Sequence, residues 1–470
     1  MNSSINLNPD RLFSAEQSQR EVAQRLYAKV KDLPIVSPHG HTDPKWFAEN
    51  KNFSNATALL IKPDHYLLRM LFSQGITMAE LGFNTENQTG EKDDSIIWQR
   101  FADNYYLFLG TPTRLWLDYV FMNVFGLTDE LNSDTAQSYY QHINKCLAQP
   151  EFKPRALFER FNIEVIATTE SAIDSLEYHQ AIIDSGWQGK IITAFRPDNV
   201  IDPEFEGFEE NLAKLSELTN ETLDTFSSYL LSLVKRRAYF KEMGATSTDH
   251  GHLTSKTLDL NEAEKNSLYL KIRCGDFTAI DADNFRAQML TEMAAMSTKD
   301  GLVMQIHPGV YRNHNQTLFN DYGRDKGADI PLATEYVENL RPLLNKFGNH
   351  PNFSLIIFTL DETTYARELA PLAGHYPALK LGPAWWFNDS PQGMLRFRQQ
   401  VTETAGFYNT VGFNDDTRAF LSIPARHDVA RRIDCTFLAE LVVKHQLTEL
   451  QAEKVAIDLT YNLVKKAYLL

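Results

Sequence analysis

"DLPIVSPHGHTDP", residues 32–44, begins as an apolar run and ends on two histidines. Ile35 and Val36 suit a buried strand, whereas the end of such a strand is a poor place for His39 and His41 unless something binds them. Side chains at positions i and i+2 of a strand point to the same side. The spacing therefore predicts that both imidazoles face one site, where neutral imidazole suits zinc and other divalent transition metals. An isolated His-x-His pair would more often be two histidines satisfied near a turn.

Seven further apolar runs follow this one, and helical stretches separate them. In residues 223–244, apolar side chains recur at helical spacing up to Gly244, a typical C-terminal signal. Short strands that alternate with helices indicate parallel strands covered by helices, and eight strands are what a (β/α)8 barrel needs. A doubly wound open sheet is the competing architecture, but no G-x-G-x-x-G follows any run. The further runs cover residues 162–170, 189–197, 244–252, 301–309, 353–361, 378–386 and 409–418.

The chain of 470 residues is long enough for one large domain with an insertion. The gap between the first two runs is too long for a single helix, and it contains helix-like stretches at 94–110 and 134–147. We therefore expect three parts: an N-terminal helix and the first barrel strand in 1–43, a helical insertion over the barrel mouth in 44–161, and the rest of the barrel with C-terminal helices in 162–470.

The composition narrows the classes of partner and the compartment. With 46 basic and 61 acidic residues the formal charge is −15, and the basic residues are scattered, which disfavours nucleic acid. A basic pocket for a small anion is compatible with this charge. Three cysteines without a C-x-x-C motif make a disulfide framework unexpected. No secretory signal is visible and no run of about 18 apolar residues occurs, so we expect a cytoplasmic protein that does not enter a membrane.

Polar side chains stand where the apolar runs end. In a (β/α)8 barrel the active site lies at the carboxyl ends of the strands, so these side chains would converge on one site. Asp416, in the last run, would lie beside the first strand once the barrel closes, and a carboxylate completes a metal site that two imidazoles begin. The other runs end on Thr169 and Glu170, Arg196, Asp249 and His250, His307, Thr359 and Asp361, Trp385 and Trp386, and Asp415 with Arg418.

Several of these residues allow two roles. Arg196 suits either a bidentate contact to a substrate carboxylate or a salt bridge to a neighbouring acid. His307 suits either a third metal ligand or a hydrogen-bond donor to substrate, and His250 leaves the same choice open. Arg418 would share a face with Asp416, where it could hold a developing negative charge.

Two further groups would border the mouth of the barrel. "KPDHYLLRM", residues 62–70, brings His65 and Tyr66 together, and such a pair can transfer protons if it reaches the mouth. The start of a solvated helix explains this stretch equally well. Trp385 and Trp386 are expected to form a wall of the pocket against the apolar face of a sugar, although aromatic side chains also fill cores.

An ordered series of stretches along nearly the whole chain resembles the uronate isomerase (glucuronate isomerase) family of the amidohydrolase superfamily. The stretches are "DLPIVSPHGHTDP", "DHY", "FRPD", "STDH", "MQIHPGVYRN", "GPAWWFNDSPQGM" and "DDTRAFLSIPARH". The resemblance implies a (β/α)8 barrel and one divalent metal ion, with zinc as the first choice. It also implies interconversion of D-glucuronate with D-fructuronate and of D-galacturonate with D-tagaturonate.

The resemblance assigns expected roles to residues of this chain. His39, His41 and Asp416 match the metal site, and Arg196 matches a contact to the substrate carboxylate. Residues that assist ring opening and proton transfer match His65, Tyr66 and Arg418. The expected substrate contacts are Arg196, His307, Arg312, Trp385 and Trp386.

The chain departs from the common family pattern around the pocket. Thr42, Glu170 and Pro308 replace the usual residues of their motifs, and Asp415 precedes Asp416 where a threonine is common. These changes bear on substrate preference more than on the reaction. No lysine ends the fourth run and no histidine ends the sixth, so one metal ion is expected rather than two.

The expected reaction is an aldose–ketose isomerisation through a cis-enediol. Asp416 is the candidate base, either directly or through a relay by Tyr66, and a hydride shift is the alternative route. A metal-dependent hydrolase and a non-catalytic sugar-acid binding protein are the rival functions. A small hexuronate is the expected partner, and a homo-oligomer the expected assembly.

Overall fold

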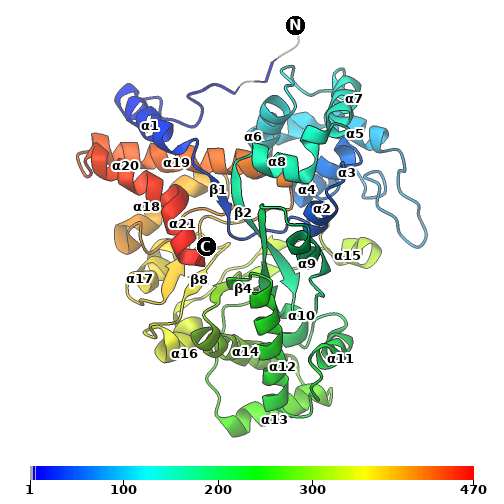
Figure 1. The fold of residues 1–470 in the computed structure, drawn as a ribbon, viewed down its shortest axis with the longest axis vertical. Helices are drawn as coiled ribbons and strands as arrows, with labels where there is room; N and C mark the ends of the chain where they lie inside the picture. Colours follow the sequence, from blue (N-terminus) through cyan, green and yellow to red (C-terminus); the bar gives the residue numbers. More distant parts are fainter. Residues whose placement is uncertain (1–3, 6) are drawn as a thin grey trace.

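The structure, a computed structural model, describes residues 4–5 and 7–470 of the chain. Seven strands form one parallel sheet that curls around a central axis (Figure 1). Six of them lie inside predicted runs and β2 extends one residue beyond its run, so the predicted barrel architecture is confirmed. In hydrogen-bonded order the strands are β1 (Ile35–Ser37), β2 (Ile163–Ser171), β3 (Lys190–Arg196), β4 (Ser247–His250), β5 (Val303–Ile306), β8 (Leu355–Ile357) and β9 (Leu379–Leu381). A small antiparallel pair, β6 (Val310–Tyr311) and β7 (Ile330–Pro331), follows β5.

The eighth predicted run, residues 409–418, occupies the last place in the barrel without forming a regular strand. It makes one isolated bridge to β9: the Leu381 N–H donates to Asn409 O over 2.9 Å, and the Val411 N–H donates to Leu381 O over 3.1 Å. The chain then turns out of the extended conformation at Gly412, whose φ is +81°. The prediction of a strand over this whole run is therefore wrong after its first residues.

The C-terminal segment explains why the ladder stops at Gly412. A Cβ atom there would lie 2.5 Å from Val464 Cγ2 and 2.6 Å from the backbone oxygen of Leu459, so only glycine fits against this packed segment. Beyond the turn, the backbone N–H of His41 donates to Thr417 O over 3.1 Å. This hydrogen bond joins the first and last segments and closes the barrel.

Helices surround the sheet. Before and after the first strand they are α1 (Gln17–Val30), α2 (Pro44–Glu49), α3 (Ala56–Leu60), α4 (His65–Ser73), α5 (Asp94–Asp103), α6 (Pro112–Tyr119), α7 (Ala136–Leu147) and α8 (Pro154–Arg160). Between β2 and β5 they are α9 (Glu177–Asp184), α10 (Asp198–Ile201), α11 (Phe208–Thr219), α12 (Phe226–Glu242), α13 (Glu262–Arg273) and α14 (Ala279–Asp300). The rest are α15 (Gln316–Tyr322), α16 (Val337–Phe347), α17 (Ala370–Ala373), α18 (Pro391–Ala405), α19 (Ile423–Val443), α20 (Glu449–Ile457) and α21 (Leu463–Tyr468).

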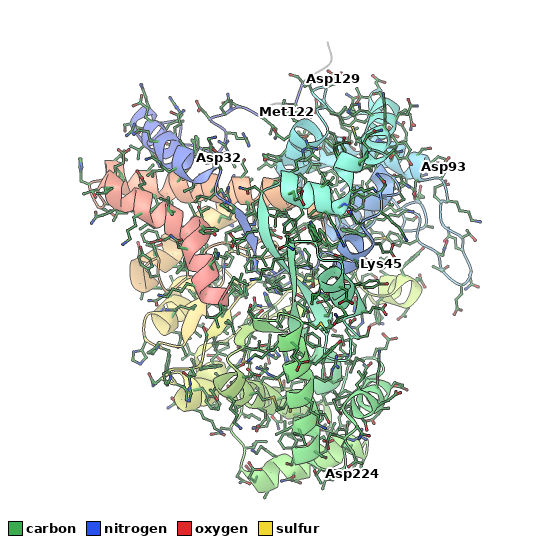
Figure 2. All side chains as sticks on the ribbon, viewed as in Figure 1. Asp32, Lys45, Asp93, Met122, Asp129 and Asp224 are labelled. Carbon is green, nitrogen blue, oxygen red and sulfur yellow. The ribbon has the colours of Figure 1, made fainter. Side chains whose placement is uncertain are left out.

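Residues 44–161 form a helical layer on one side of the barrel, where α3 to α8 gather at the upper right of Figure 1. Their apolar faces form a cluster that includes Trp98, Phe101 and Phe121 and that continues into residues of the first three strands. The division of the chain at residues 43 and 161 stays a prediction. Charged side chains such as Asp93, Asp129 and Asp224 are exposed at the periphery (Figure 2), as the acidic composition requires.

Apolar side chains of β1, β2, β3, β5 and β8 pack together in the barrel. Val36, Val165 and Ile356 belong to one buried cluster, and Val464 and Tyr468 of α21 pack into it. The end of the chain thus contributes to the barrel core. Among the described residues, no helix combines the length and apolar character that crossing a bilayer requires.

Glu170 lies outside the barrel core, between β2, β3 and α9. Its carboxyl accepts hydrogen bonds from Thr168 Oγ1 (2.8 Å) and from Thr193 Oγ1, and His179 Nε2 lies 3.7 Å away. Burial raises the pKa of Glu170 from 4.5 to about 8, although the threonine hydroxyls oppose the shift. The folded protein therefore holds this carboxyl in its neutral form at neutral pH.

Replacing Glu170 by Gln should stabilise the protein at alkaline pH. In the unfolded chain the carboxyl ionises near 4.5, so ionisation favours unfolding increasingly as the pH rises from there to the folded pKa near 8. The neutral amide escapes this effect, and its oxygen still accepts from the threonines. The gain in unfolding free energy from Gln should grow by roughly 3 kcal/mol between pH 5 and pH 8 in urea unfolding. Glu403→Gln, on an exposed face of α18, is the control, and an equal gain at both pH values would contradict the expectation.

Candidate active site

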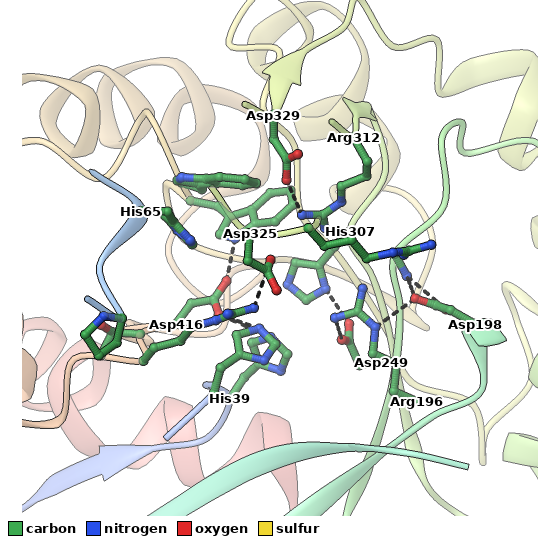
Figure 3. Close-up of a pocket in the computed structure, with 18 of the residues that line it drawn as sticks. His39, His65, Arg196, Asp198, Asp249, His307, Arg312, Asp325, Asp329 and Asp416 are labelled. Carbon is green, nitrogen blue, oxygen red and sulfur yellow. Dashed lines mark hydrogen bonds and ion pairs between the residues drawn. The ribbon is translucent and has the colours of Figure 1, made fainter. Parts of the chain in front are cut away.

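A cavity of about 610 Å³ lies at the carboxyl ends of the strands, under the N-terminal end of α4 (Figure 3). Its walls come from the ends of β3 and β4, from the loops after β1, β3, β5 and β9, and from the segment that replaces the eighth strand. The residues with a predicted site role all line this cavity: His39, His41, His65, Tyr66, Arg196, His307, Arg312, Trp385, Trp386, Asp416 and Arg418. Their convergence is observed, whereas their individual roles stay predictions. The expectation that all strand-end side chains converge here is wrong for five of them, which do not line it: Thr169, Glu170, His250, Thr359 and Asp361.

Asp416 meets three imidazoles at the bottom of the cavity. Its Oδ1 lies 3.5 Å from His39 Nε2 and 3.3 Å from His41 Nε2. The ligand atoms of His39, His307 and Asp416 all lie within 4.8 Å of one another. The candidate metal-binding group therefore consists of His39, His307 and Asp416, whereas the sequence had predicted His39, His41 and Asp416. His41 contacts this group through its approach to the Asp416 carboxylate.

The donor atoms of this group fit a divalent metal ion. His39 is 1% exposed, and burial lowers its pKa to about 4, so its imidazole is neutral and offers a lone pair at neutral pH. Among the described residues, Asp416 Oδ1 and His307 Nε2 are buried without a hydrogen-bond partner. Buried polar atoms are rarely left in this state, and a cation among them would satisfy them.

The backbone and a tryptophan hold Asp416 in place. Its φ of +37° lies in the left-handed region, which is unusual for a residue with a side chain. Trp385 Nε1 donates a hydrogen bond to Oδ2 of the same carboxylate. Burial alone would raise the pKa of Asp416, but His39 and His41 lower it below its ordinary value, so the group is an anion. An uncommon backbone conformation at such a residue is typical of functional sites.

Asp249, at the end of β4, ties His307 to Arg196. Its Oδ1 accepts from His307 Nδ1 over 2.6 Å, and its Oδ2 lies 3.1 Å from Arg196 Nη1. Although burial opposes it, Arg196 and then His307 lower the pKa of Asp249 well below its usual range. The bond to Nδ1 fixes the tautomer of His307 and leaves Nε2 as the acceptor that a metal requires. The strand-end pattern contained Asp249, but it did not indicate this role.

Arg196 forms salt bridges to neighbouring acids and also faces the cavity. Its Nε donates to Asp198 Oδ2 over 2.7 Å, while the guanidinium also lines the cavity. Gly251 leaves room for it, since a Cβ atom there would lie 2.1 Å from Arg196 Nη2. A guanidinium carries five N–H donors, so the contacts to Asp198 and Asp249 do not exhaust it.

A second histidine–carboxylate group lies behind the cavity wall. Ligand atoms of Asp198, His250 and His252 lie within 4.8 Å of one another. Both oxygens of Asp198 already accept from the Gly251 N–H, at 3.2 and 3.1 Å, and the Arg196 cation is bonded to Oδ2. A cation placed here would share its one carboxylate with a guanidinium, so this group is the poorer metal site.

The rim of the cavity contains residues that the sequence analysis missed. Arg418 Nη2 lies 3.2 Å from Asp325 Oδ1, and Arg312 Nη1 donates to Asp329 Oδ2 over 2.8 Å. Burial, followed by the charge of Arg418, lowers the pKa of His65 to about 4, so that its imidazole is neutral. The two aspartates belong to the loop after α15, outside any strand end, where no pattern pointed to them.

An aromatic wall faces these rim residues. The Trp386 ring stacks on Phe387 with centroids 4.8 Å apart, and it lies 5.1 Å from the His65 ring. The guanidinium of Arg312 lies 5.5 Å from the Trp386 centroid. The aromatic side of the cavity is therefore present, and the Trp386 ring faces the guanidinium of Arg312.

Comparison with known proteins places this site in a family. A family model described as glucuronate isomerase matches residues 13–468. A uronate isomerase of Rhizorhabdus wittichii is 62% identical over 464 residues, which cover 99% of this chain and 98% of the relative. The chain belongs to the glucuronate isomerase family.

Solved structures agree with this membership of the glucuronate isomerase family. A glucuronate isomerase from Caulobacter crescentus superposes with a TM-score of 0.98 at 56% identity, covering 99% of this chain and 98% of that one. A uronate isomerase from Thermotoga maritima superposes with a TM-score of 0.91 at 28% identity, covering 98% and 99%. The predicted family and enzyme class are confirmed, and neither a hydrolase nor a non-catalytic binding protein is favoured.

Metal analysis separates the two histidine–carboxylate groups of this glucuronate isomerase family member. His39→Asn should lower the divalent metal content of the purified protein roughly tenfold or more, because it removes a buried ligand. His252→Asn should leave the content unchanged, because Asp198 is already bonded to Arg196. Mass spectrometry of the desalted proteins measures both. Metal loss in the His252 variant alone would assign the ion to the other group.

Proposed function

We propose that the protein interconverts D-glucuronate with D-fructuronate, and D-galacturonate with D-tagaturonate, using one divalent metal ion, with zinc as the first choice. The observation that carries this proposal is the division of charge within one cavity. The anionic carboxylate of Asp416 meets the neutral imidazole of His39 and the ring of His307 at its bottom, and guanidinium groups stand on its walls. Such a cavity suits a small molecule that has metal-binding oxygens at one end and a carboxylate at the other. Homo-oligomerisation and a cytoplasmic location stay predictions from the sequence.

Arg196 would orient the substrate. Its remaining N–H donors would bind the carboxylate of the uronate, and Asp198 and Asp249 hold the guanidinium in one position while they do so. Fixing the distal end places the first two carbons of the chain near Asp416, so that proton transfer proceeds within a bound complex. A divalent ion held by His39, His307 and Asp416, with His41 beside them, would supply Lewis-acid polarisation of the substrate carbonyl.

Asp416 would carry out the proton transfer. Its carboxylate would take the proton from the carbon beside the aldehyde and return it to the aldehyde carbon, either directly or through Tyr66, while the proton of the neighbouring hydroxyl passes to the aldehyde oxygen. The enediolate formed between the two steps would be stabilised by the cation of Arg418. Arg418 would first have to release Asp325, which it contacts at 3.2 Å.

Activity and the role of Asp416 can be tested together. The metal-loaded protein, incubated separately with D-glucuronate and D-galacturonate, should form a ketose from each. Asp416→Asn should lower kcat by roughly a thousandfold or more, because the amide cannot accept the proton. Asp224→Asn, an exposed change far from the cavity, should leave the rate unchanged. Full activity in the Asp416 variant would refute the assigned base.

Solvent deuterium distinguishes the two routes of hydrogen transfer. If the proton passes through Asp416, it has the opportunity to exchange, so ketose formed in D2O should carry deuterium at the carbon that receives it. A hydride shift would carry the original hydrogen across and leave that carbon unlabelled. NMR of the product gives the answer, with ketose incubated without enzyme as the control for slow exchange.

A further inference from the structure

The phenol of Tyr66 makes two hydrogen bonds to protein groups at the cavity wall. Tyr66, on the first turn of α4, donates from its hydroxyl to Asp389 Oδ1 over 2.9 Å. The same oxygen accepts the backbone N–H of Phe387 over 3.0 Å. Since Phe387 supplies a donor, the phenolic hydrogen must point to the carboxylate. One lone pair of the hydroxyl remains, and Tyr66 lines the cavity, so a substrate hydroxyl would meet an acceptor there.

Asp389 has a fixed cation on its other side. Arg426 Nη1 donates to Asp389 Oδ2 over 3.0 Å, and both side chains are buried. The Arg426 guanidinium lies 3.5 Å from the centroid of the Trp116 ring and donates through Nε to Ser422 Oγ over 3.1 Å. These contacts leave the guanidinium little freedom. The carboxylate therefore stands between a phenol that faces substrate and a cation that cannot move away.

The environment favours movement of a proton toward Asp389 over formation of a phenolate. Burial raises the pKa of Tyr66 well above its ordinary value and also raises that of Asp389, although Arg426 opposes the second shift. Asp64, the N-cap of α4, also faces Arg426, and burial raises its pKa as well. A buried acid that binds a proton more readily can accept one, and a tyrosine that resists ionisation can pass one on without becoming an anion.

We propose that Tyr66 and Asp389 form a proton relay in which Asp389 is the terminal acceptor. A substrate hydroxyl gives its proton to Tyr66 Oη while the phenolic proton passes to Asp389 Oδ1. One O–H bond breaks in the substrate and one in Tyr66, and one forms at each of Tyr66 and Asp389. No electrons are transferred, and the reverse movement returns the proton.

The relay rests on the proposed function, because an aldose–ketose isomerisation needs the open chain of a sugar that is mostly cyclic. Opening the ring removes the proton from the hydroxyl on the anomeric carbon and breaks the bond to the ring oxygen, which takes up a proton from water. Asp416 is already assigned to the proton transfer between the two carbons, whereas the two oxygens of Asp389 bond only to Tyr66 and Arg426 among the side chains of the described residues. The relay thus assigns a second acid–base group to the cavity and makes Asp389 a positioning and proton-storing residue behind Tyr66.

Kinetics of four variants test the relay in the metal-loaded protein with D-glucuronate. Asp389→Asn and Tyr66→Phe should each lower kcat by roughly 100-fold with little change in KM, since each interrupts the same transfer. The double variant should be no slower than either single one, because the two residues act as a unit. Asp389→Glu, which keeps a carboxylate, should recover much of the rate. A packing defect would give neither this recovery nor this non-additivity.

A charge-balanced variant guards against a failure to fold. Asp389→Asn leaves Arg426 buried without its anion, so Asp389→Asn with Arg426→Gln replaces the ion pair by a neutral hydrogen-bonded pair. It should be as slow as Asp389→Asn. Additive losses, or near-normal rates in either Asn variant, would overturn the relay while the wild-type rate upholds the isomerase. If the wild-type protein converts neither uronate, the proposed function and the relay fall together.

Discussion

Closure of the barrel through the hydrogen bond from His41 N–H to Thr417 O is the constraint on which the rest of the site depends. His41 lies two residues after His39, and Thr417 directly follows Asp416, so the bond joins the two segments that carry these side chains. The bond brings Asp416 to the imidazoles of His39 and His41, which follow β1, at 3.5 and 3.3 Å. Because the last segment leaves the regular ladder at Gly412, the backbone at Asp416 is free to take the left-handed conformation that a continuous strand would exclude.

Asp249 extends the same constraint across the cavity. The carboxylate joins the imidazole of His307 on one side and the guanidinium of Arg196 on the other, at 2.6 and 3.1 Å. The buried side chain of Asp249 therefore fixes the distance between His307, in the candidate metal-binding group, and Arg196, the proposed partner of the substrate carboxylate. A substrate whose reacting carbons and carboxylate are spaced to match would bind without distortion of either end, which is how a rigid site selects chain length.

The sequence predicted the parts of this molecule that follow from periodicity and strand ends. Seven runs contain strands, and residues at the ends of several of them line one cavity, because parallel strands of a barrel deliver their carboxyl ends to one face. The eighth run failed because packing of Val464 against Gly412, a contact between distant residues, ended the ladder. Asp325 and Asp329 were missed for a related reason. They lie in a loop, and their pairing with arginines depends on tertiary placement that no local pattern encodes.

Every arginine that lines the site forms an ion pair with a carboxylate. The exposed fraction of each pair indicates which ion pair an anionic substrate can break. The side chains of Arg418 and Asp325 are 38% and 46% exposed, so water screens their attraction and the pair contributes little. Those of Arg426 and Asp389 are 5% and 12% exposed, and separating them would leave a buried charge without compensation. An anionic substrate would therefore exchange with Asp325 at Arg418, near the rim, and leave the deeper pair intact. The buried pair is consequently available to Tyr66 throughout the reaction, while the exposed pair acts as a contact that substrate replaces.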